Sequence, residues 1–190
     1  PNYDLKQLGI KTSIKRMYPD WLSLDAGHLG EVYERSGEAV SGMGCRAYLS
    51  PFYHPETGKE IYNGRFNIGA VTLNLVKIAL EAQGDKTVFF SLLEKYSQIV
   101  FDIHEWTYEQ LSTVRGISNP LLFCQGGAWM SVEPHETIEP LLPAATASLG
   151  YIGLEECCQA MFGSGVVTNH EFALDVIKQL RYYCDAAKST

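Results

Sequence analysis

Residues 64–80 read GRFNIGAVTLNLVKIAL, a strand pattern that runs directly into a helix pattern. Residues 68–75 are mostly apolar and include β-branched side chains, which is typical of a strand buried on both faces. Asn74 is suited to capping the following helix, which is expected to reach about Gln83 and to end at Gly84. This stretch therefore favours an α/β fold.

The sequence downstream continues the alternation of strands and helices. Residues 85–114 form the next predicted helix, because apolar side chains recur there every three or four positions. His104 stands beside the charged residues of that helix and is predicted to face solvent. A second strand is predicted at residues 146–152, followed by helices over 153–162 and 170–187. This alternation indicates parallel strand pairing.

The sequence upstream gives weaker signals. Residues 10–17 have a short helical pattern, and residues 21–24 are predicted to form a buried strand. Residues 25–41 are rich in glycine, glutamate and serine and are predicted to form a loop. Residues 50–64 are predicted to be a connection, with a turn at residues 55–58.

Length and composition limit the class of protein. The chain has 190 residues, and we expect one domain over residues 1–190. It begins at Pro1, from which we expect the natural start to lie upstream, and no signal peptide is recognised. The formal charge is −7 without a basic cluster, so nucleic acid is not an expected partner. No apolar run approaches the roughly 18 residues of a membrane span.

The cysteines indicate a reducing compartment. The five cysteines stand at positions 45, 124, 157, 158 and 184, and no two of them form a Cys-x-x-Cys pair. That spacing argues against a disulfide scaffold and against a zinc site. We therefore expect a cytoplasmic protein without a metal ligand set in this chain.

One cysteine stands in a glycine-rich stretch, residues 41–50, which read SGMGCRAYLS. Gly42 and Gly44 can adopt positive φ, which suits a tight loop with a projecting tip. Cys45 at such a tip can be held against a substrate. The residues alone leave a second interpretation open, that Cys45 is a small buried hydrophobe, the commoner fate of a free cysteine.

Residues 144–155 read AATASLGYIGLE and form a third distinctive block. GMGCRAYLSP, GRFNIGAVTLNLVKIAL and this block together resemble the oxygen-sensitive, glycyl-radical ribonucleotide reductases, that is, the class III or anaerobic ribonucleoside-triphosphate reductases. The blocks keep the family's order, and the resemblance covers residues 19–163. It implies part of a ten-stranded α/β barrel of the glycyl-radical/ribonucleotide reductase type, with residues 41–50 as a cysteine-bearing finger loop.

The resemblance also implies roles for individual residues. Cys45 would bear the thiyl radical that removes the 3′-hydrogen of the ribose, after which the 2′-hydroxyl leaves as water. Met43 and Ala47 would lie on the same loop beside the substrate, where class I relatives have asparagine and glutamate. Neither side chain can transfer a proton, which agrees with formate as the reductant. Asn67 matches a position next to the substrate sugar, where its amide can donate and accept hydrogen bonds.

Thr146, Ala147 and Ser148 resemble the segment that holds substrate phosphates in ribonucleotide reductases. They precede the helix predicted at Gly153, and helix N-termini present N–H groups that suit phosphate. The residues alone fit another interpretation, in which Thr146 and Ser148 satisfy local backbone groups. The resemblance favours phosphate binding.

The family's cofactors and partners complete the expectation. Its radical glycine and four-cysteine zinc site have no counterpart in these 190 residues, so this chain alone is expected to be inactive. The full-length enzyme would use a glycyl radical and structural zinc. It would be activated by a radical-SAM enzyme with a 4Fe–4S cluster and S-adenosylmethionine. Its other partners would be a nucleoside triphosphate, formate and a second copy in a homodimer.

Two alternatives remain beside this interpretation. The first is a non-catalytic nucleotide-binding or assembly module with the same fold. The second is a glycyl-radical lyase, which the single cysteine in the loop disfavours. Cys157 and Cys158 are adjacent, as is the pair in pyruvate formate-lyase, but their helical pattern favours a packing role.

Overall fold

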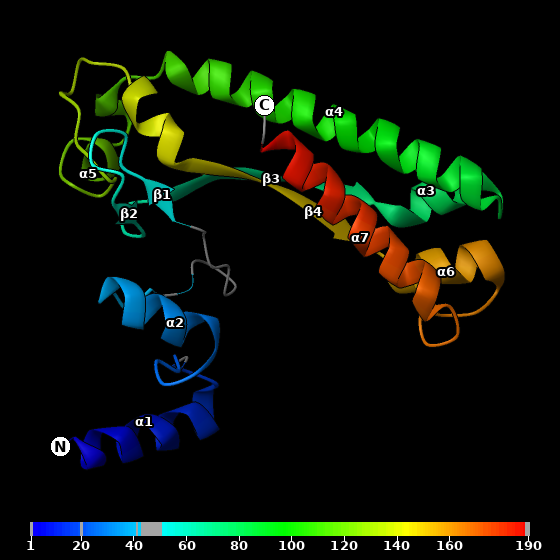
Figure 1. Cartoon of the computed structure of the whole chain (residues 1–190), viewed down its shortest axis with the longest axis horizontal. Coiled ribbons are helices and arrows are strands. Elements are labelled where there is room, and N and C mark those ends of the chain that lie inside the picture. Colours follow the sequence, from blue (N-terminus) through cyan, green and yellow to red (C-terminus); the bar gives the residue numbers. More distant parts are fainter. Residues whose placement is uncertain (1, 20, 41, 43–50, 189–190) are drawn as a thin grey trace. The chain divides into compact units, whose positions relative to one another are not determined.

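The computed structural model of the chain describes residues 2–19, 21–40, 42 and 51–188 (Figure 1). The chain divides into two compact units, Pro1–Asn63 and Gly64–Thr190. None of the helices in the described part is long and apolar enough to cross a membrane.

The described residues of the first unit form two helices and a small hairpin. The helices are α1 (Tyr3–Arg16) and α2 (Gly27–Ser36), and the hairpin pairs β1 (Phe52–Tyr53) with β2 (Glu60–Ile61) in antiparallel fashion. The turn predicted at residues 55–58 joins the two hairpin strands, so that prediction is confirmed.

The strand predicted at residues 21–24 is wrong, because Trp21 packs on α1 instead. A Cβ atom built at Gly9 would lie 2.7 Å from the Trp21 ring, so the missing side chain leaves room for the indole. Trp21 Nε1 also donates a hydrogen bond to Ser13 Oγ at 3.0 Å. The helix predicted at residues 10–17 is confirmed, and in the structure it begins earlier, at Tyr3.

The loop predicted at residues 25–41 is also wrong, because most of it is α2. Glycine lowers helix propensity, but tertiary contacts override that preference here. Val32 is buried. Arg35 donates from Nε to Glu60 Oε2 at 3.1 Å and from Nη2 to the Tyr62 hydroxyl at 2.8 Å. These contacts join α2 to the hairpin, and the helix ends at Gly37 with φ 73°.

The second unit is a parallel strand pair with helices. Its longer elements are β3 (Phe66–Asn74), α3 (Leu75–Ala82), α4 (Lys86–Ser112), β4 (Ala145–Ile152), α6 (Leu154–Phe162) and α7 (His170–Ala187). The short helical turns η1 (Gly116–Ser118), α5 (Pro120–Phe123) and η2 (Glu139–Ala144) lie between α4 and β4. β3 and β4 pair in parallel, as the alternation of elements predicts.

The caps of these helices follow the sequence. Asn74 Oδ1 accepts the Lys77 N–H at 3.1 Å and begins α3. Asp85 Oδ1 accepts the Thr87 N–H at 2.8 Å and thereby begins α4. Gly163, with φ 74°, ends α6. All three boundaries were predicted, because a capping side chain or a glycine is a local signal.

One hydrophobic core joins the strand pair to four helices, α3, α4, α6 and α7 (Figure 1). Its largest buried side chains with almost no exposed surface are Leu75, Ile78, Phe89, Leu93, Cys157, Cys158 and Val176. The aromatic rings of Phe89 and Phe172 meet at 5.1 Å between centroids and join α4 to α7. The predicted packing role of Cys157 and Cys158 agrees with this burial.

The buried face of α4 differs in part from the prediction. Ile99 and Ile103 are 42% and 40% exposed, although both were predicted to belong to the core face. Ser97 and His104 are buried instead, with 1% and 9% of their surface exposed. The prediction that His104 faces solvent is therefore wrong. Its spacing from Phe89 places it on the side of α4 that meets the sheet.

Candidate functional site

A bulge in β3 decides which side chains of the two strands share a face. Asn67 lies opposite Thr146, but the next paired residue of β3 is Gly69, opposite Ala147, so Ile68 is an extra residue. Opposed residues of a ladder point to the same face, and successive residues alternate. The extra residue therefore moves Asn67 onto the face of Thr146 and away from that of Gly69.

The two faces of the strand pair have different surroundings. Val71 and Leu149 lie opposite each other and pack against the helical core. Ala70 and Ser148, the preceding opposed pair, therefore point to the other face. Ala70 is exposed, and Ser148 is half-buried. Thr146 shares this face with Ser148 by alternation, and Asn67 shares it because it lies opposite Thr146, so the face turned away from the helices carries these three polar side chains.

Asn67, Thr146 and Ser148 are joined on this face by hydrogen bonds. Asn67 Nδ2 donates to Ser148 Oγ at 2.5 Å and, over a longer distance of 3.4 Å, to Thr146 Oγ1. Asn67 Oδ1 accepts the Gly69 N–H at 2.7 Å, which fixes the orientation of the amide. We call these three side chains the polar row. Among the described residues, the Ser148 hydroxyl hydrogen has no acceptor, so it can donate to a ligand.

Ala147 has a different place from its neighbours. It pairs with Gly69, and its side chain belongs to the face that meets the helices. Its backbone alone is available to a ligand on the polar face. Its assignment to substrate binding stays a prediction.

The start of α6 lies away from the polar row. β4 runs from Ala145 to Ile152, and α6 begins only after Gly153. Five steps along the extended chain, at about 3.3 Å each, separate Ser148 from Gly153 by roughly 16 Å. The N-terminus of α6 is therefore not adjacent to Thr146 and Ser148 along the chain, and its contribution to phosphate binding stays a prediction.

Two further side chains contact backbone carbonyl groups near the polar row, one in β4 and one directly before it, and neither was selected from the sequence. His104 Nε2 lies 3.1 Å from the carbonyl oxygen of Ser148. Arg65 Nε donates to the carbonyl oxygen of Ala144 at 3.1 Å. A signal for His104 existed, since it stands at helical spacing from the buried residues Val100 and Phe89.

Arg65 is partly withdrawn from water. Its Nη1 is buried and has no hydrogen-bond partner in the described part of the chain. Burial lowers the pKa of Arg65 from its ordinary value, and nearby Tyr108 opposes this shift. Burial likewise raises the pKa of Tyr108. The guanidinium therefore retains hydrogen-bonding capacity beside the start of β4.

A groove of about 880 Å³ lies on the helical side of β4. α4 contributes His104 and Tyr108 to it, β4 contributes Thr146 and Ala147, and α7 contributes Cys184. The groove therefore borders the back of the strand that carries the polar row.

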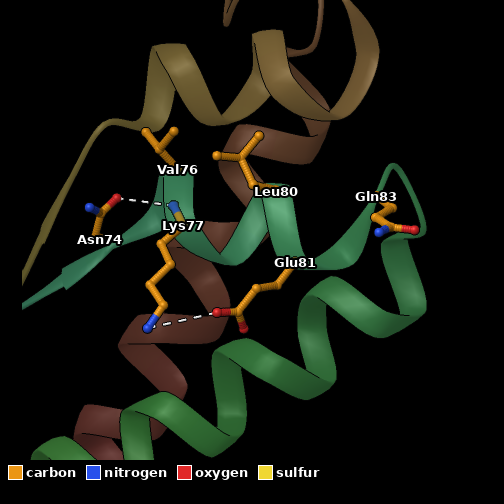
Figure 2. A pocket seen from close by; sticks show the side chains of 6 residues that line it. All are labelled: Asn74, Val76, Lys77, Leu80, Glu81 and Gln83. Atoms are coloured by element: carbon orange, nitrogen blue, oxygen red, sulfur yellow. Dashed lines mark hydrogen bonds and ion pairs between the residues drawn. The ribbon is translucent and has the colours of Figure 1, made fainter.

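A shallower hollow of about 500 Å³ lies over α3, and Figure 2 shows its lining side chains. They are Asn74, Val76, Lys77, Leu80, Glu81 and Gln83. Lys77 Nζ and Glu81 Oε1 form an ion pair at 3.7 Å across one helical turn (Figure 2). Leu80 is 64% exposed. None of the predicted site residues that the structure describes lines this hollow, and we assign it no role.

Cys45, Met43 and Ala47 lie outside the described residues, so their predicted roles rest on the resemblance alone. Among the residues that the structure does describe, no group of three or more His, Cys, Asp or Glu side chains is placed to hold a metal ion.

Cys157 is expected to resist alkylation in the folded protein. Burial, and to a lesser degree Cys158, raises its pKa to about 12. Only the thiolate reacts, and at pH 8 its fraction would be about a thousandfold smaller than for a thiol of ordinary pKa. Site-resolved mass spectrometry after iodoacetamide treatment should find Cys157 unmodified in the native protein and modified after denaturation. Rapid native labelling of Cys157 would contradict its role as a packing residue.

A comparison with protein families gives one match over the whole chain. The model of the family described as anaerobic ribonucleoside-triphosphate reductase matches residues 1–190.

Individual relatives carry the same name. The anaerobic ribonucleoside-triphosphate reductases of Salmonella typhimurium and Escherichia coli are each 33% identical over 194 aligned positions, which cover 99% of this chain and 26% of the relative. That of Enterobacteria phage T4 is 36% identical over 162 positions, covering 82% of this chain and 26% of the relative. The chain thus spans about a quarter of the length of these relatives.

Proposed function

Because the chain belongs to the anaerobic ribonucleoside-triphosphate reductase family, we propose that it is a central segment of an enzyme that reduces ribonucleoside triphosphates to 2′-deoxyribonucleoside triphosphates. The observation that carries the proposal is the polar row, in which Asn67, Thr146 and Ser148 are hydrogen-bonded on the sheet face turned away from the helices. The resemblance assigns these same residues to the substrate.

The ribose is proposed to bind at Asn67. Its amide oxygen is held by the Gly69 N–H, and its amide nitrogen points to Ser148. An amide held in this way presents its remaining hydrogen-bonding capacity in a fixed direction, which supports precise placement of a sugar hydroxyl.

The phosphates are proposed to bind at Thr146 and Ser148. The Ser148 hydroxyl accepts a hydrogen bond from Asn67 and keeps its own hydrogen for a ligand. The contacts of the Thr146 hydroxyl with described residues are long, 3.4 Å from Asn67 Nδ2 and 3.5 Å to the carbonyl oxygen of Phe66. Both hydroxyls can therefore turn towards a phosphate oxygen, and hydrogen bonds to a charged group are stronger than neutral ones.

Cys45 is proposed to perform the radical step. Its sulfur would take a hydrogen atom from C3′ of the ribose, which leaves a thiol and a carbon radical. The 2′-hydroxyl then departs as water. In the net reaction formate supplies two electrons and becomes carbon dioxide, and one proton is consumed. Met43 and Ala47, on either side of Cys45, are proposed to contact the substrate without proton transfer.

The remaining partners are proposed from the family. A glycyl radical elsewhere in the full-length polypeptide would supply the unpaired electron to Cys45, and a radical-SAM enzyme would generate that radical. Structural zinc, a second copy in a homodimer and a cytoplasmic location are proposed on the same ground. The described residues hold no ligand set for zinc, so none of them is assigned to it.

The fold is proposed to be part of a ten-stranded α/β barrel, with residues 1–190 belonging to its single catalytic domain. Parallel sheets are normally covered on both faces and contain more than two strands. β3 and β4 form a two-stranded parallel sheet on which Ala70 and Thr72 are exposed. This arrangement fits a part of a larger sheet.

The phosphate assignment is tested by removing one hydroxyl at a time from the full-length protein. Thr146→Val and Ser148→Ala should each weaken binding of a nucleoside triphosphate roughly ten- to a hundredfold, since a hydrogen bond to a charged group contributes about 1.5–3 kcal/mol. Isothermal titration calorimetry measures the affinity.

Thr107→Val is the matched control, because the Thr107 hydroxyl donates to the Ile103 carbonyl within α4, at 2.7 Å, and Thr107 does not belong to the polar row. It should bind nucleotide as the unmodified protein does. Unchanged affinity in both Thr146→Val and Ser148→Ala would move the phosphate site elsewhere.

A further inference from the structure

We propose that His104 is a positioning residue, which holds β4 at the Ser148 carbonyl and so keeps the Ser148 hydroxyl in place for nucleotide binding. This inference rests on the proposed function for its consequence, but the contact that it assigns does not depend on that function.

The contact between His104 and the Ser148 carbonyl is made on the side of the strand pair that meets the helices. His104 projects from α4, and only 9% of its surface is exposed. Its Nε2 lies 3.1 Å from the Ser148 carbonyl oxygen, which can only accept a hydrogen bond. Nε2 therefore carries the hydrogen and donates it. The bond joins the longest helix of the unit to the residue that contributes a hydroxyl to the polar row.

Burial of the polar His104 ring costs free energy, and the hydrogen bond to the Ser148 carbonyl offsets that cost. Phe89, Leu93 and Val100 occupy the same buried face of α4, so an apolar side chain would suit the helix equally well. A buried polar group is unfavourable unless it is hydrogen-bonded. The Ser148 contact is the hydrogen bond that accounts for a histidine at this position.

β4 benefits from a partner at this carbonyl. In a parallel pair only alternate residues of a strand bond to the neighbouring strand, so other carbonyl groups need partners elsewhere. Arg65 Nε supplies a similar contact to Ala144 at 3.1 Å. The two contacts lie on either side of Thr146 and fix the path of the strand through the polar row.

The His104 bond affects the polar row because the same residue, Ser148, provides both the carbonyl that His104 contacts and the hydroxyl that contacts Asn67. The 2.5 Å contact between Ser148 Oγ and Asn67 Nδ2 requires β4 to keep its place relative to β3. Loss of the His104 bond would let the strand shift and would separate the two side chains. Small displacements of positioning groups have large effects, about a hundredfold for 1 Å in favourable cases.

The test uses the full-length protein and three substitutions of His104. His104→Gln places an amide N–H where the histidine Nε2–H was and should keep affinity for a nucleoside triphosphate within about twofold. His104→Leu removes the donor and His104→Asn is too short to reach, so each should weaken binding about three- to tenfold. Ser97→Ala is the control, because Ser97 is buried on the same face of α4 two turns earlier.

Hydrogen–deuterium exchange over residues 145–152, without nucleotide, separates this inference from the proposed function. Exchange should be faster in His104→Leu and His104→Asn than in His104→Gln and Ser97→Ala. If the unmodified protein binds no nucleoside triphosphate, the proposed function fails and the exchange still tests the contact. Unchanged exchange in His104→Leu and His104→Asn, or an equal loss of affinity in His104→Gln, would overturn the positioning role.

Discussion

Cys45→Ser in the full-length protein is expected to abolish reduction of ribonucleoside triphosphates while the glycyl radical still forms at its normal yield. Serine keeps the size of the side chain, but an O–H bond is much stronger than an S–H bond, so the hydroxyl cannot be converted to the radical that removes the 3′-hydrogen. Chromatography of the nucleotides measures product, and electron paramagnetic resonance measures the radical.

Cys124→Ser serves as the control, because Cys124 is a half-buried free cysteine of the second unit and lies beside Gly116, outside the polar row. It should retain both turnover and radical. Turnover close to normal in Cys45→Ser, with the radical intact, would show that another residue performs the hydrogen abstraction.

Gly64→Ala is expected to destabilise the second unit by about 2–5 kcal/mol, for two reasons that add. Gly64 has φ +73°, a left-handed conformation that costs a residue with a Cβ about 1–2 kcal/mol. An added Cβ would also lie 2.5 Å from the carbonyl carbon of Ala128 and 2.8 Å from the Cα of Trp129. Backbone atoms cannot move aside without strain, and overpacking costs about 1–3 kcal/mol.

Gly163→Ala separates the two causes. Gly163 has φ +74°, and nothing lies within 4 Å of an added Cβ, so this variant bears only the conformational cost. Thermal unfolding followed by circular dichroism should therefore show a clearly larger fall in midpoint for Gly64→Ala. Equal midpoints for the two variants would contradict the close approach of Gly64 to the backbone of residues 128–129.

The predictable parts of the fold are those with local causes. Asn74 and Asp85 cap helices through their own side chains, and Gly163 ends one through its backbone. The wrong predictions concern residues whose conformation depends on contacts with other elements of the fold. Trp21 is an aromatic residue of the kind that is common in strands, but its ring packs against α1 at Gly9. α2 is helical despite its glycines, and Arg35 binds it to Glu60 of the hairpin and to nearby Tyr62.

The candidate site was likewise predictable only in part. The resemblance selects Asn67, Thr146 and Ser148, but it gives no reason for them to meet. They meet because Ile68 is an extra residue in β3; without it Asn67 would point to the helices. Gly69, with φ 142°, was an available signal, since glycine within a strand pattern often marks a bulge.

Binding of the substrate by the polar row is tested by a crystal structure of the full-length protein with a bound ribonucleoside triphosphate. We expect a ribose hydroxyl within hydrogen-bond distance of the Asn67 amide and phosphate oxygens bound by the hydroxyls of Thr146 and Ser148. A substrate nucleotide that contacts none of these three side chains would contradict it.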